Sequence, residues 1–434
     1  FGDRAFMSPN PSEIRVNPAG KHDKDPAYGW IMVLVAFTLS AFAFGALGSI
    51  SVFLKPLAAE FGWGRGDISL AYTATAFSSA LFGILWGYVA DRLGTRWFGV
   101  VGALVMTLAL YLLSTQSSLW QFYAYFFLFG AFGHSLVSAP LFANVGFWFK
   151  QNPGLALGIT ASGGATGQGA VPYVVGLAIT AYGWQSAFEL MAIVFLLVTL
   201  PMAFLVRESP SRQQARLVPE SVVKDFPLAD FEVVAWLGIA VLFCCNCMSV
   251  PIVHLVPLLT DNGMAMESAT RVFLVLMLAG AVGRIVGGKL GDVIGPLPTY
   301  MIMSLGQTTF VFWFPYMDSG FGLYLLAICF GFTYSGVMSS ILVCTRIMVS
   351  AKFAARGMGM TSFFGWGGMG LGGFMGGYLF DLYGDYQNAF AFASLMGVIN
   401  LLILLLFTLR IRRARRTEAD ASRLAAAVVP VQVA

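Results

Sequence analysis

Charged side chains are scarce in this chain, and the shortage limits what the protein can be. Asp, Glu, Lys and Arg make up 11% of the 434 residues, whereas hydrophobic residues make up 58%. Soluble globular proteins carry about 25% charged residues. The composition therefore excludes an ordinary water-facing surface and favours a protein that is surrounded by lipid.

Cysteine and histidine are also rare, with five and three residues. All the cysteines lie in apolar runs, where they are better explained as small packing residues than as disulfides or metal ligands: Cys244, Cys245, Cys247, Cys329 and Cys344. There is no glycine loop followed by Lys-Ser or Lys-Thr, and no HExxH motif. We therefore expect no cofactor, no metal, no use of ATP and no enzymatic activity.

Long apolar runs are abundant instead. A helix needs roughly 17–25 apolar residues to cross a bilayer, and twelve runs approach that length, the third and ninth being short. They lie near residues 30–54, 70–90, 98–114, 120–143, 155–181, 186–206, 236–259, 272–290, 299–316, 321–345, 358–380 and 387–409. The sequence thus predicts an all-α membrane protein with twelve transmembrane helices in two six-helix halves.

The two halves repeat each other at a constant offset of 201 residues. Gly62 recurs as Gly263, and the segment GYVADRLG (87–94) recurs as GKLGDVIG (288–295). Separate pairs that share one offset indicate a duplicated unit. Because membrane proteins built from two parallel repeats usually place a substrate site between them, the repeat predicts solute transport.

Positive charge is concentrated on one side of the predicted spans. Of 25 Lys and Arg residues, 21 lie at the termini, in the loops on the same side, or at adjoining span ends. The opposite loops hold Lys55, Arg65 and Arg271, and Arg284 is the remaining one. Since cytoplasmic loops are enriched in Lys and Arg, we expect both termini in the cytoplasm and the protein in a plasma or inner membrane.

These features predict five segments: a disordered cytoplasmic N-terminus (1–28), a first bundle (29–206), a cytoplasmic linker (207–235), a second bundle (236–409) and a basic tail (410–434). Neither terminal segment is expected to fold. The N-terminus lacks the apolar core of a signal peptide, and we expect FGDRAF to be foreign and Met7 to be the natural start. The tail's RIRRARR run is expected to contact anionic lipid, not nucleic acid.

Glycine is concentrated in two spans that the offset makes equivalent, GITASGGATGQGAVP (158–172) and GWGGMGLGGFMGG (365–377). Small residues let helices in a membrane approach closely. Two interpretations remain open: tight packing within each half, or moving contacts between the halves.

A motif between the second and third spans, G-x-x-x-D-R-x-G-x-R, is formed by Gly87, Asp91, Arg92, Gly94 and Arg96, and it recurs in weaker form at Gly288, Asp292 and Gly295. With twelve spans in a 6+6 repeat, it resembles the major facilitator superfamily over essentially the whole chain. The resemblance implies a monomeric transporter that works by alternating access. It also implies that this motif is a cytoplasmic latch and not a substrate site.

A narrower resemblance is to the monocarboxylate transporter branch, which includes bacterial lactate and oxalate carriers. It is carried by DPAYGW (25–30), GFWFKQNPGLALGITASGGATG (146–167) and AGAVGRIVGGKLGD (279–292), which places Arg284 where the branch keeps an intramembrane arginine. Three departures matter: no lysine in 44–53, Gly280 in place of an acid, and no second cation in 360–368. One arginine favours a substrate with one carboxylate, and the missing acid puts the animal proton-coupling scheme in doubt.

Arg284 is the strongest candidate for substrate binding. It lies deep in the eighth span, where a charge costs at least about 2.5–3.5 kcal/mol on insertion scales. Its guanidinium suits bidentate pairing with a carboxylate and stays protonated. The alternative is a static salt bridge, but no other predicted span carries an acidic residue in its interior. A substrate carboxylate is therefore the favoured counter-ion.

Two histidines lie within predicted spans. His134 is in the middle of the fourth span, and because imidazole has an ordinary pKa of about 6.5 it is our candidate for carrying a coupled proton. A hydrogen-bonded core histidine is the competing interpretation. His254 lies near the outer end of the seventh span between two prolines, and we expect packing or gating there.

Asn246, Tyr334 and Ser335 lie on spans that line the cavity in the resembled family, and each can donate a hydrogen bond to a carboxylate or hydroxyl. For each, a helix–helix hydrogen bond worth about 0.6–2 kcal/mol is the alternative. Aromatic residues that can wall an apolar pocket, with packing as the default, are Phe44, Tyr72, Phe332, Phe363 and Trp366.

These observations predict proton-coupled symport of a small organic anion, a lactate-like or pyruvate-like monocarboxylate, by a secondary transporter. Co-transport of an anion and a proton is electrically neutral, so it needs no work against the membrane potential. An anion exchanger or an exporter of larger amphipathic acids is the main alternative. A non-transporting membrane receptor has less support, because no large soluble domain is present to carry a signal.

Overall fold

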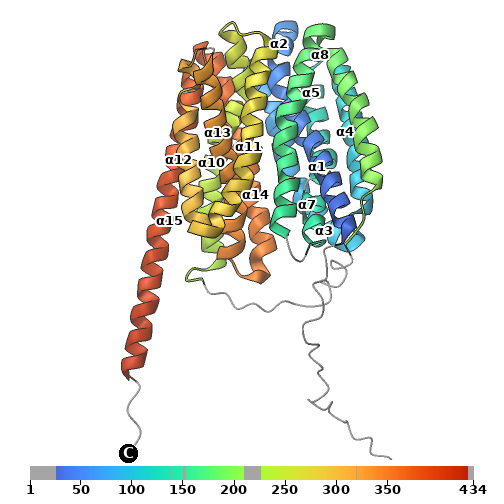
Figure 1. The fold of residues 1–434 in the computed structure, drawn as a ribbon. Helices are drawn as coiled ribbons and strands as arrows, with labels where there is room; N and C mark the ends of the chain where they lie inside the picture. Colours follow the sequence, from blue (N-terminus) through green and yellow to red (C-terminus); the bar gives the residue numbers. More distant parts are fainter. Residues whose placement is uncertain (1–25, 138, 150–152, 210–225, 319, 429–434) are drawn as a thin grey trace, which may run out of the picture.

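The computed structural model describes residues 26–137, 139–149, 153–209, 226–318 and 320–428 and is entirely helical there (Figure 1). The first half comprises α1 (Ala27–Gly48), α2 (Ile50–Phe61), α3 (Arg65–Leu93), α4 (Arg96–Ser114), α5 (Leu119–Leu128), the π-helix η2 (Phe129–His134), α6 (Ser135–Val137), α7 (Ala139–Gly146) and α8 (Pro153–Phe204). The second half comprises α10 (Asp230–Asp261), α11 (Met266–Ile294), α12 (Pro296–Val311), the short 3-10 helix η3 (Phe314–Tyr316), α13 (Phe321–Met348), α14 (Ala351–Tyr383) and α15 (Gln387–Val428).

Among the described residues, nine helical stretches are long and apolar enough to cross a membrane. One of them, Ala156–Phe204, contains two helices, because Gly183 interrupts α8 with non-helical backbone angles (φ 84°, ψ 170°). The 16-residue α12 and the 33-residue α14 complete the predicted set of helices. The predicted all-α membrane fold is confirmed, with short helices at the third and ninth positions.

The two halves stand side by side, the first in blue to green and the second in yellow to red (Figure 1). We call the end at which α8 ends and α10 begins the linker end, and the opposite end, where α2 and α10 end, the far end. Within the halves, α8 packs on α1 and α4, and α10 packs on α14 and α15. Whether segments 29–206 and 236–409 fold as separate units stays a prediction.

The backbone repeats the 201-residue offset at its turns. Gly62 and Gly263 both have positive φ (68° and 85°), as do Gly94 and Gly295 (83° and 93°). Positive φ also occurs at Gly183 and at Gly384, 201 residues later. Glycine is favoured there because side chains with a Cβ avoid this region. The duplicated sequence therefore encodes the same helix ends in both halves.

The C-terminal segment differs from the prediction. The expectation that the chain is unfolded after residue 410 is wrong up to Val428, because α15 continues as a helix that projects beyond the bundle (Figure 1). Residues 410–428 contain no Gly or Pro and are rich in Ala and Arg, which are good helix formers. Arg410 pairs with Glu232 of α10 (2.9 Å), and Ile411 is buried, so the extension is anchored where it leaves the bundle. Residues 1–25 lie outside the described part, and α1 begins at Ala27.

The glycine-rich spans make contacts both within a half and between the halves, on different helix faces; that the contacts between the halves move stays a prediction. A Cβ at Gly167 would lie 1.9 Å from the Ala41 carbonyl oxygen of α1, and one at Gly368 would lie 2.2 Å from the Leu242 oxygen of α10. These are contacts within a half. Gly169 and its equivalent on α14 instead face the other half, as described next.

Candidate functional site

Two pairs of helices join the halves, and they are equivalent under the repeat. On α14, a Cβ at Gly370 would lie 3.2 Å from the Cα of Thr73 on α3. On α8, a Cβ at Gly169 would lie 3.2 Å from the Cα of Leu274 on α11. Gly370 lies 201 residues after Gly169, and Leu274 lies 201 residues after Thr73. The α3·α14 and α8·α11 contacts are therefore equivalent interfaces, one for each half of the repeat.

The contacts do not continue to the linker end. Gly158 and Gly359 lie eleven residues before Gly169 and Gly370; since eleven residues are three turns, they occupy nearly the same helix faces about 16 Å closer to the linker end. A Cβ at either position would meet no atom within 4 Å, and the same holds at Gly87 of α3 and at its equivalent on α11. The halves thus touch toward the far end and separate toward the linker end.

Arg284 lies where the halves separate. Its Nη1 donates to the backbone oxygen of Ala161 on α8 (2.6 Å), so the side chain bridges the two halves. Its Nε has no hydrogen-bond partner, and no carboxylate is paired with it in the described part of the chain. Ser339 holds the backbone by donating to the Arg284 oxygen (2.9 Å).

His134 lies at the end of the π-helix η2. It is buried between Phe44 of α1 (ring centroids 4.7 Å apart) and Trp366 of α14 (5.2 Å), which belongs to the other half. Neither ring nitrogen has a hydrogen-bond partner among the described residues. Short π-helical segments often occur at functional sites. We use the name apex cluster for these two contacts between the halves, that of Arg284 with the Ala161 carbonyl and that of His134 with Phe44 and Trp366.

A second polar bridge lies closer to the far end. The Tyr334 hydroxyl of α13 donates to Gln168 Oε1 of α8 (3.3 Å). The buried Tyr72 hydroxyl of α3 has no hydrogen-bond partner among the described residues. Gln168 was not among the predicted site residues. The available signal was an amide inside an otherwise small and apolar run, GATGQGAVP.

The other predicted polar residues are buried against glycines of their own half. Asn246 Oδ1 faces Gly372 of α14, and Ser335 Oγ faces Gly280 of α11; in the part of the chain that the structure describes, neither atom has a hydrogen-bond partner. His254 is buried near the far end, away from the apex cluster, where its ring nitrogens form hydrogen bonds with the Tyr386 hydroxyl and the Gly373 oxygen.

The loop motif shows glycine at a constrained turn. Gly94 ends α3 with φ 83°, and a Cβ there would lie 2.8 Å from Glu208 Oε2. Arg96 begins α4 with its guanidinium over the ring of Trp97, and Asp292 is exposed on the last turn of α11. The side chains of Asp91 and Arg92 lie outside the described part of the structure, so the latch role of this motif stays a prediction.

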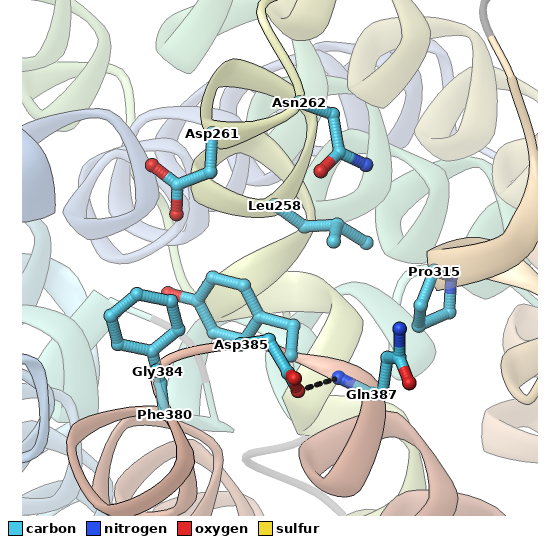
Figure 2. Close-up of a pocket in the computed structure, with 9 residues that line it drawn as sticks. Leu258, Asp261, Asn262, Pro315, Phe380, Gly384, Asp385 and Gln387 are labelled. Carbon is cyan, nitrogen blue, oxygen red and sulfur yellow. Dashed lines mark hydrogen bonds between the residues drawn. The ribbon is translucent and has the colours of Figure 1, made fainter.

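Two cavities occur at the far end. One of about 230 Å³ is lined by Leu258, Asp261, Asn262, Pro315, Phe380, Gly384, Asp385, Tyr386 and Gln387 (Figure 2). A larger one, of about 650 Å³, lies near Tyr324. All lining residues of both cavities belong to the second half, so neither lies between the halves. The apex cluster is the better candidate for a site that both halves share.

Comparisons with known proteins agree with this geometry. The family model described as Major Facilitator Superfamily matches residues 33–373. A Rattus norvegicus protein named monocarboxylate transporter 13 is 27% identical over 381 residues, covering 85% of this chain and 86% of the relative.

Two further matches are more partial or more distant. The riboflavin transporter RibJ of Trypanosoma brucei brucei is 28% identical over 198 residues, which is 44% of this chain and 36% of that protein. A crystal structure of a mutant of the nucleoside transporter NupG superposes with a TM-score of 0.69 at 14% identity, covering 86% of this chain and 99% of that one. At that identity the structural match shows the fold alone.

Proposed function

Because the chain belongs to the Major Facilitator Superfamily, a family of secondary transporters and not of enzymes, we propose that it carries a small monocarboxylate together with a proton. The observation that carries the proposal is the guanidinium of Arg284, which bridges the two halves with no carboxylate partner among the described residues. The name of the rat relative, a monocarboxylate transporter, supports the same substrate class.

The chemistry of Arg284 fits this role. A carboxylate can accept two parallel hydrogen bonds from a guanidinium; Nη1 is engaged only by the neutral Ala161 carbonyl, and Nε is unused. A substrate carboxylate would replace a weaker neutral acceptor and neutralise a charge inside the membrane. Since Ala161 and Arg284 belong to different halves, substrate binding and the relative position of the halves are coupled at this residue.

We further propose that the linker end faces the cytoplasm, as the positive charges predict. The structure then corresponds to a state that is closed to the outside and open to the inside. Uptake would require the far end to open, the solute to reach the apex cluster, and the halves to return to the present arrangement. The proposed transporter is a monomer in a plasma or inner membrane with both termini in the cytoplasm.

The test is uptake of labelled lactate and pyruvate by proteoliposomes, with and without an inward proton gradient. Symport predicts uptake above that of protein-free vesicles and stimulation by the gradient. A gradient that leaves the initial rate unchanged, in vesicles that do take up the acid, contradicts proton coupling. No uptake of either acid by folded protein contradicts the small-substrate proposal and leaves the family assignment intact.

His134 is proposed as the proton carrier, because its imidazole is buried between aromatic rings of both halves. His134→Ala is expected to remove the stimulation of uptake by the proton gradient while leaving exchange of pre-loaded substrate intact. His254→Ala is the comparison variant: it removes a buried histidine of the far end, so uptake should keep its stimulation by the proton gradient even where its rate changes. Uptake by the His134 variant with unchanged dependence on pH would exclude this assignment.

The second candidate is exchange or export of a larger, planar acid. The aromatic rings of Phe44 and Trp366, 6.1 Å apart and nearly parallel, favour it, because such rings can stack on a flat substrate. The match to proteins named riboflavin transporters points the same way. Counterflow driven by an aromatic acid, with no dependence on a proton gradient, would support this candidate over the first.

A further inference from the structure

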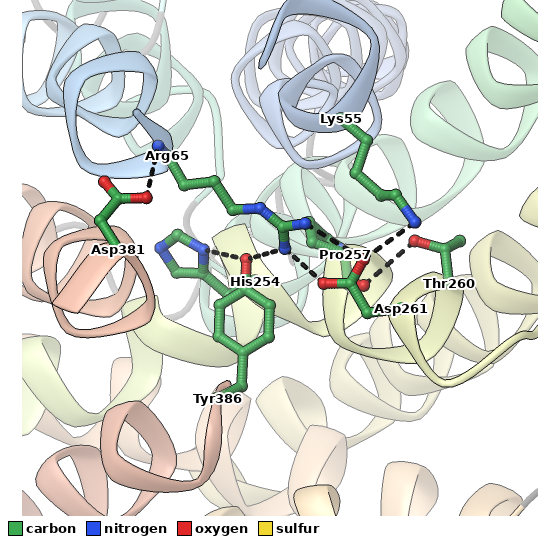
Figure 3. Close-up of polar contacts among 8 residues, drawn as sticks. All are labelled: Lys55, Arg65, His254, Pro257, Thr260, Asp261, Asp381 and Tyr386. Atoms are coloured by element: carbon green, nitrogen blue, oxygen red, sulfur yellow. Dashed lines mark hydrogen bonds and ion pairs between the residues drawn. The ribbon is translucent and has the colours of Figure 1, made fainter. Parts of the chain in front are cut away.

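The far end is held closed by carboxylate contacts between the halves that, among the described residues, occur beside only one of the two equivalent helix pairs. In the α3·α14 pair, the Asp381 carboxylate accepts hydrogen bonds from the backbone amides of Arg65 (2.9 Å) and Gly66 (2.7 Å) (Figure 3). These amides open α3, where amides have no acceptor within their own helix. The N-cap residue is Gly64, which has no side chain to cap with. A carboxylate of the second half therefore caps a helix of the first half.

The sequence is adapted to this contact. A Cβ at Gly64 would lie 2.8 Å from Asp381 Oδ2, so glycine leaves the room that the carboxylate occupies. The repeat equivalent of Gly64 is Ala265, the N-cap of α11, which has no side-chain cap. The equivalent of Asp381 is Thr180, whose hydroxyl bonds to Gly176 of its own helix. The α8·α11 pair therefore lacks the cross-half cap.

A second carboxylate acts across the same boundary. Asp261, at the end of α10, accepts from both terminal nitrogens of Arg65 and pairs with Lys55 of α2 (2.9 Å) (Figure 3). Its repeat equivalent, Glu60, bonds instead to Trp184 and Gln185, both in its own half. The duplicated unit thus carries the same acidic position twice, once facing inward to its half and once facing the partner half.

The arginine at the centre is held from several sides. Its guanidinium lies 3.7 Å from the ring centre of Phe380 and donates to the Tyr386 hydroxyl (2.9 Å). Burial raises the pKa of that hydroxyl, so it keeps its proton and can donate onward to His254 Nδ1 (3.3 Å). His254 Nε2 is then the protonated nitrogen and donates to the Gly373 oxygen (2.7 Å). Arg65 is therefore fixed in the position that binds Asp261.

We infer that Asp381 and Asp261, with Arg65 and Lys55, form a far-end lock that sets how often the transporter opens at that end. Opening must separate α3 from α14, which uncaps α3 and parts Asp261 from two cations at once. Among the described residues, the α8·α11 pair has no such carboxylate contact between the halves at this end; its contacts there include Gly176 against Thr270 and Arg271 beside Tyr173. Asp381 is a positioning residue that acts through α3, and the inference holds whichever solute is carried.

The test compares the accessibility of single introduced cysteines in detergent, where reagents reach both ends of the protein. The far-end reporter is Thr73→Cys, at a position bonded to Gly370 across the closed interface (2.7 Å). The linker-end reporter is Gly359→Cys, at a position with open space around it. The rate of maleimide labelling is measured for each, with the protein that lacks a reporter giving the background from native cysteines.

Asp381→Ala and Asp261→Asn are each expected to raise labelling of the far-end reporter roughly fivefold, the effect of losing a helix cap or a comparable charged contact. Labelling of the linker-end reporter should fall in the same variants. Glu60→Gln is the matched control, since Glu60 binds only within its half among the contacts described. In this variant the labelling rates of both reporters should equal those of the parent.

Gly64→Ala provides a second, independent variant. The backbone at Gly64 (φ −63°, ψ 151°) suits alanine, so the added methyl should disturb only the closed state, by displacing Asp381. It should change the labelling rate of each reporter in the same direction as Asp381→Ala does. The lock is refuted if folded Asp381→Ala and Gly64→Ala label at the parent rate, or if Glu60→Gln shifts the reporters equally. A failure of lactate uptake would not bear on either outcome.

Discussion

Arg284→Ala is expected to lower the initial rate of substrate uptake at least about 30-fold while the folded protein remains in the membrane. Truncating one partner of a desolvated, hydrogen-bonded charge pair costs about 2–5 kcal/mol, which corresponds to about 30-fold or more in affinity. The loss should exceed that of a neutral contact, because the substrate carboxylate would enter the membrane interior without a counter-ion. Initial rates over a range of substrate concentrations measure the effect.

Two variants make this result specific. Arg284→Lys keeps the charge but loses the planar fork, and uptake should fall to a level between those of the parent and the alanine variant. Arg271→Ala is the comparison on the same helix: Arg271 is exposed near the far end, where it pairs with Glu267 one turn away and lies beside Tyr173 of α8. Its affinity for the substrate should equal that of the parent. Parent-like affinity in Arg284→Ala would show that the carboxylate binds elsewhere.

The features predicted well from sequence are those that local chemistry determines. Twelve apolar runs gave the fold class because a bilayer imposes a minimum helix length on each run separately. Arg284 stood out because a charge within an apolar run is costly wherever its partner lies. The family resemblance, drawn from Gly87 to Arg96 and their repeat, is confirmed by the match over residues 33–373.

What escaped prediction depends on pairs that are distant in the chain. Asp381 is 316 residues from Arg65, whose amide it caps, and a carboxylate at a helix end gives no sign of which helix it faces. Lys55 and Arg65 were counted only as charges of an outer loop, although both bind Asp261. Gln168 was passed over because its partner, Tyr334, lies in the other half.

The internal repeat contains more information about the site residues than the sequence analysis used. Comparing the halves position by position shows where they differ: Gly83 occupies the position equivalent to Arg284, and Thr180 the one equivalent to Asp381. Duplicated folding requirements keep equivalent residues alike, as the paired positive-φ glycines show. Positions where charge appears in one half alone therefore mark the residues that the fold does not require, and these are the best candidates for function.

A disulfide across the α3·α14 interface is expected to stop transport and to release it on reduction. In Ala76→Cys with Gly370→Cys, the two Cβ atoms would lie about 3.5 Å apart, within the range found in disulfides. The bond would hold the far end closed, so substrate could not exchange between the two sides. Uptake by the oxidised double variant should fall to the level of protein-free vesicles and recover after treatment with a thiol reductant.

A cross-link within one half separates this effect from damage by the disulfide itself. Gly99→Cys with Ala203→Cys joins α4 to α8 inside the first half, where the Cβ atoms would lie 3.3 Å apart, so the local geometry is closely matched. Because alternating access moves the halves as bodies against each other, this variant should transport in both redox states. Full oxidation of the Ala76 and Gly370 variant, verified by intact mass, with transport unimpaired would mean that α3 and α14 never part. The solute would then have to pass by a route that does not open this interface.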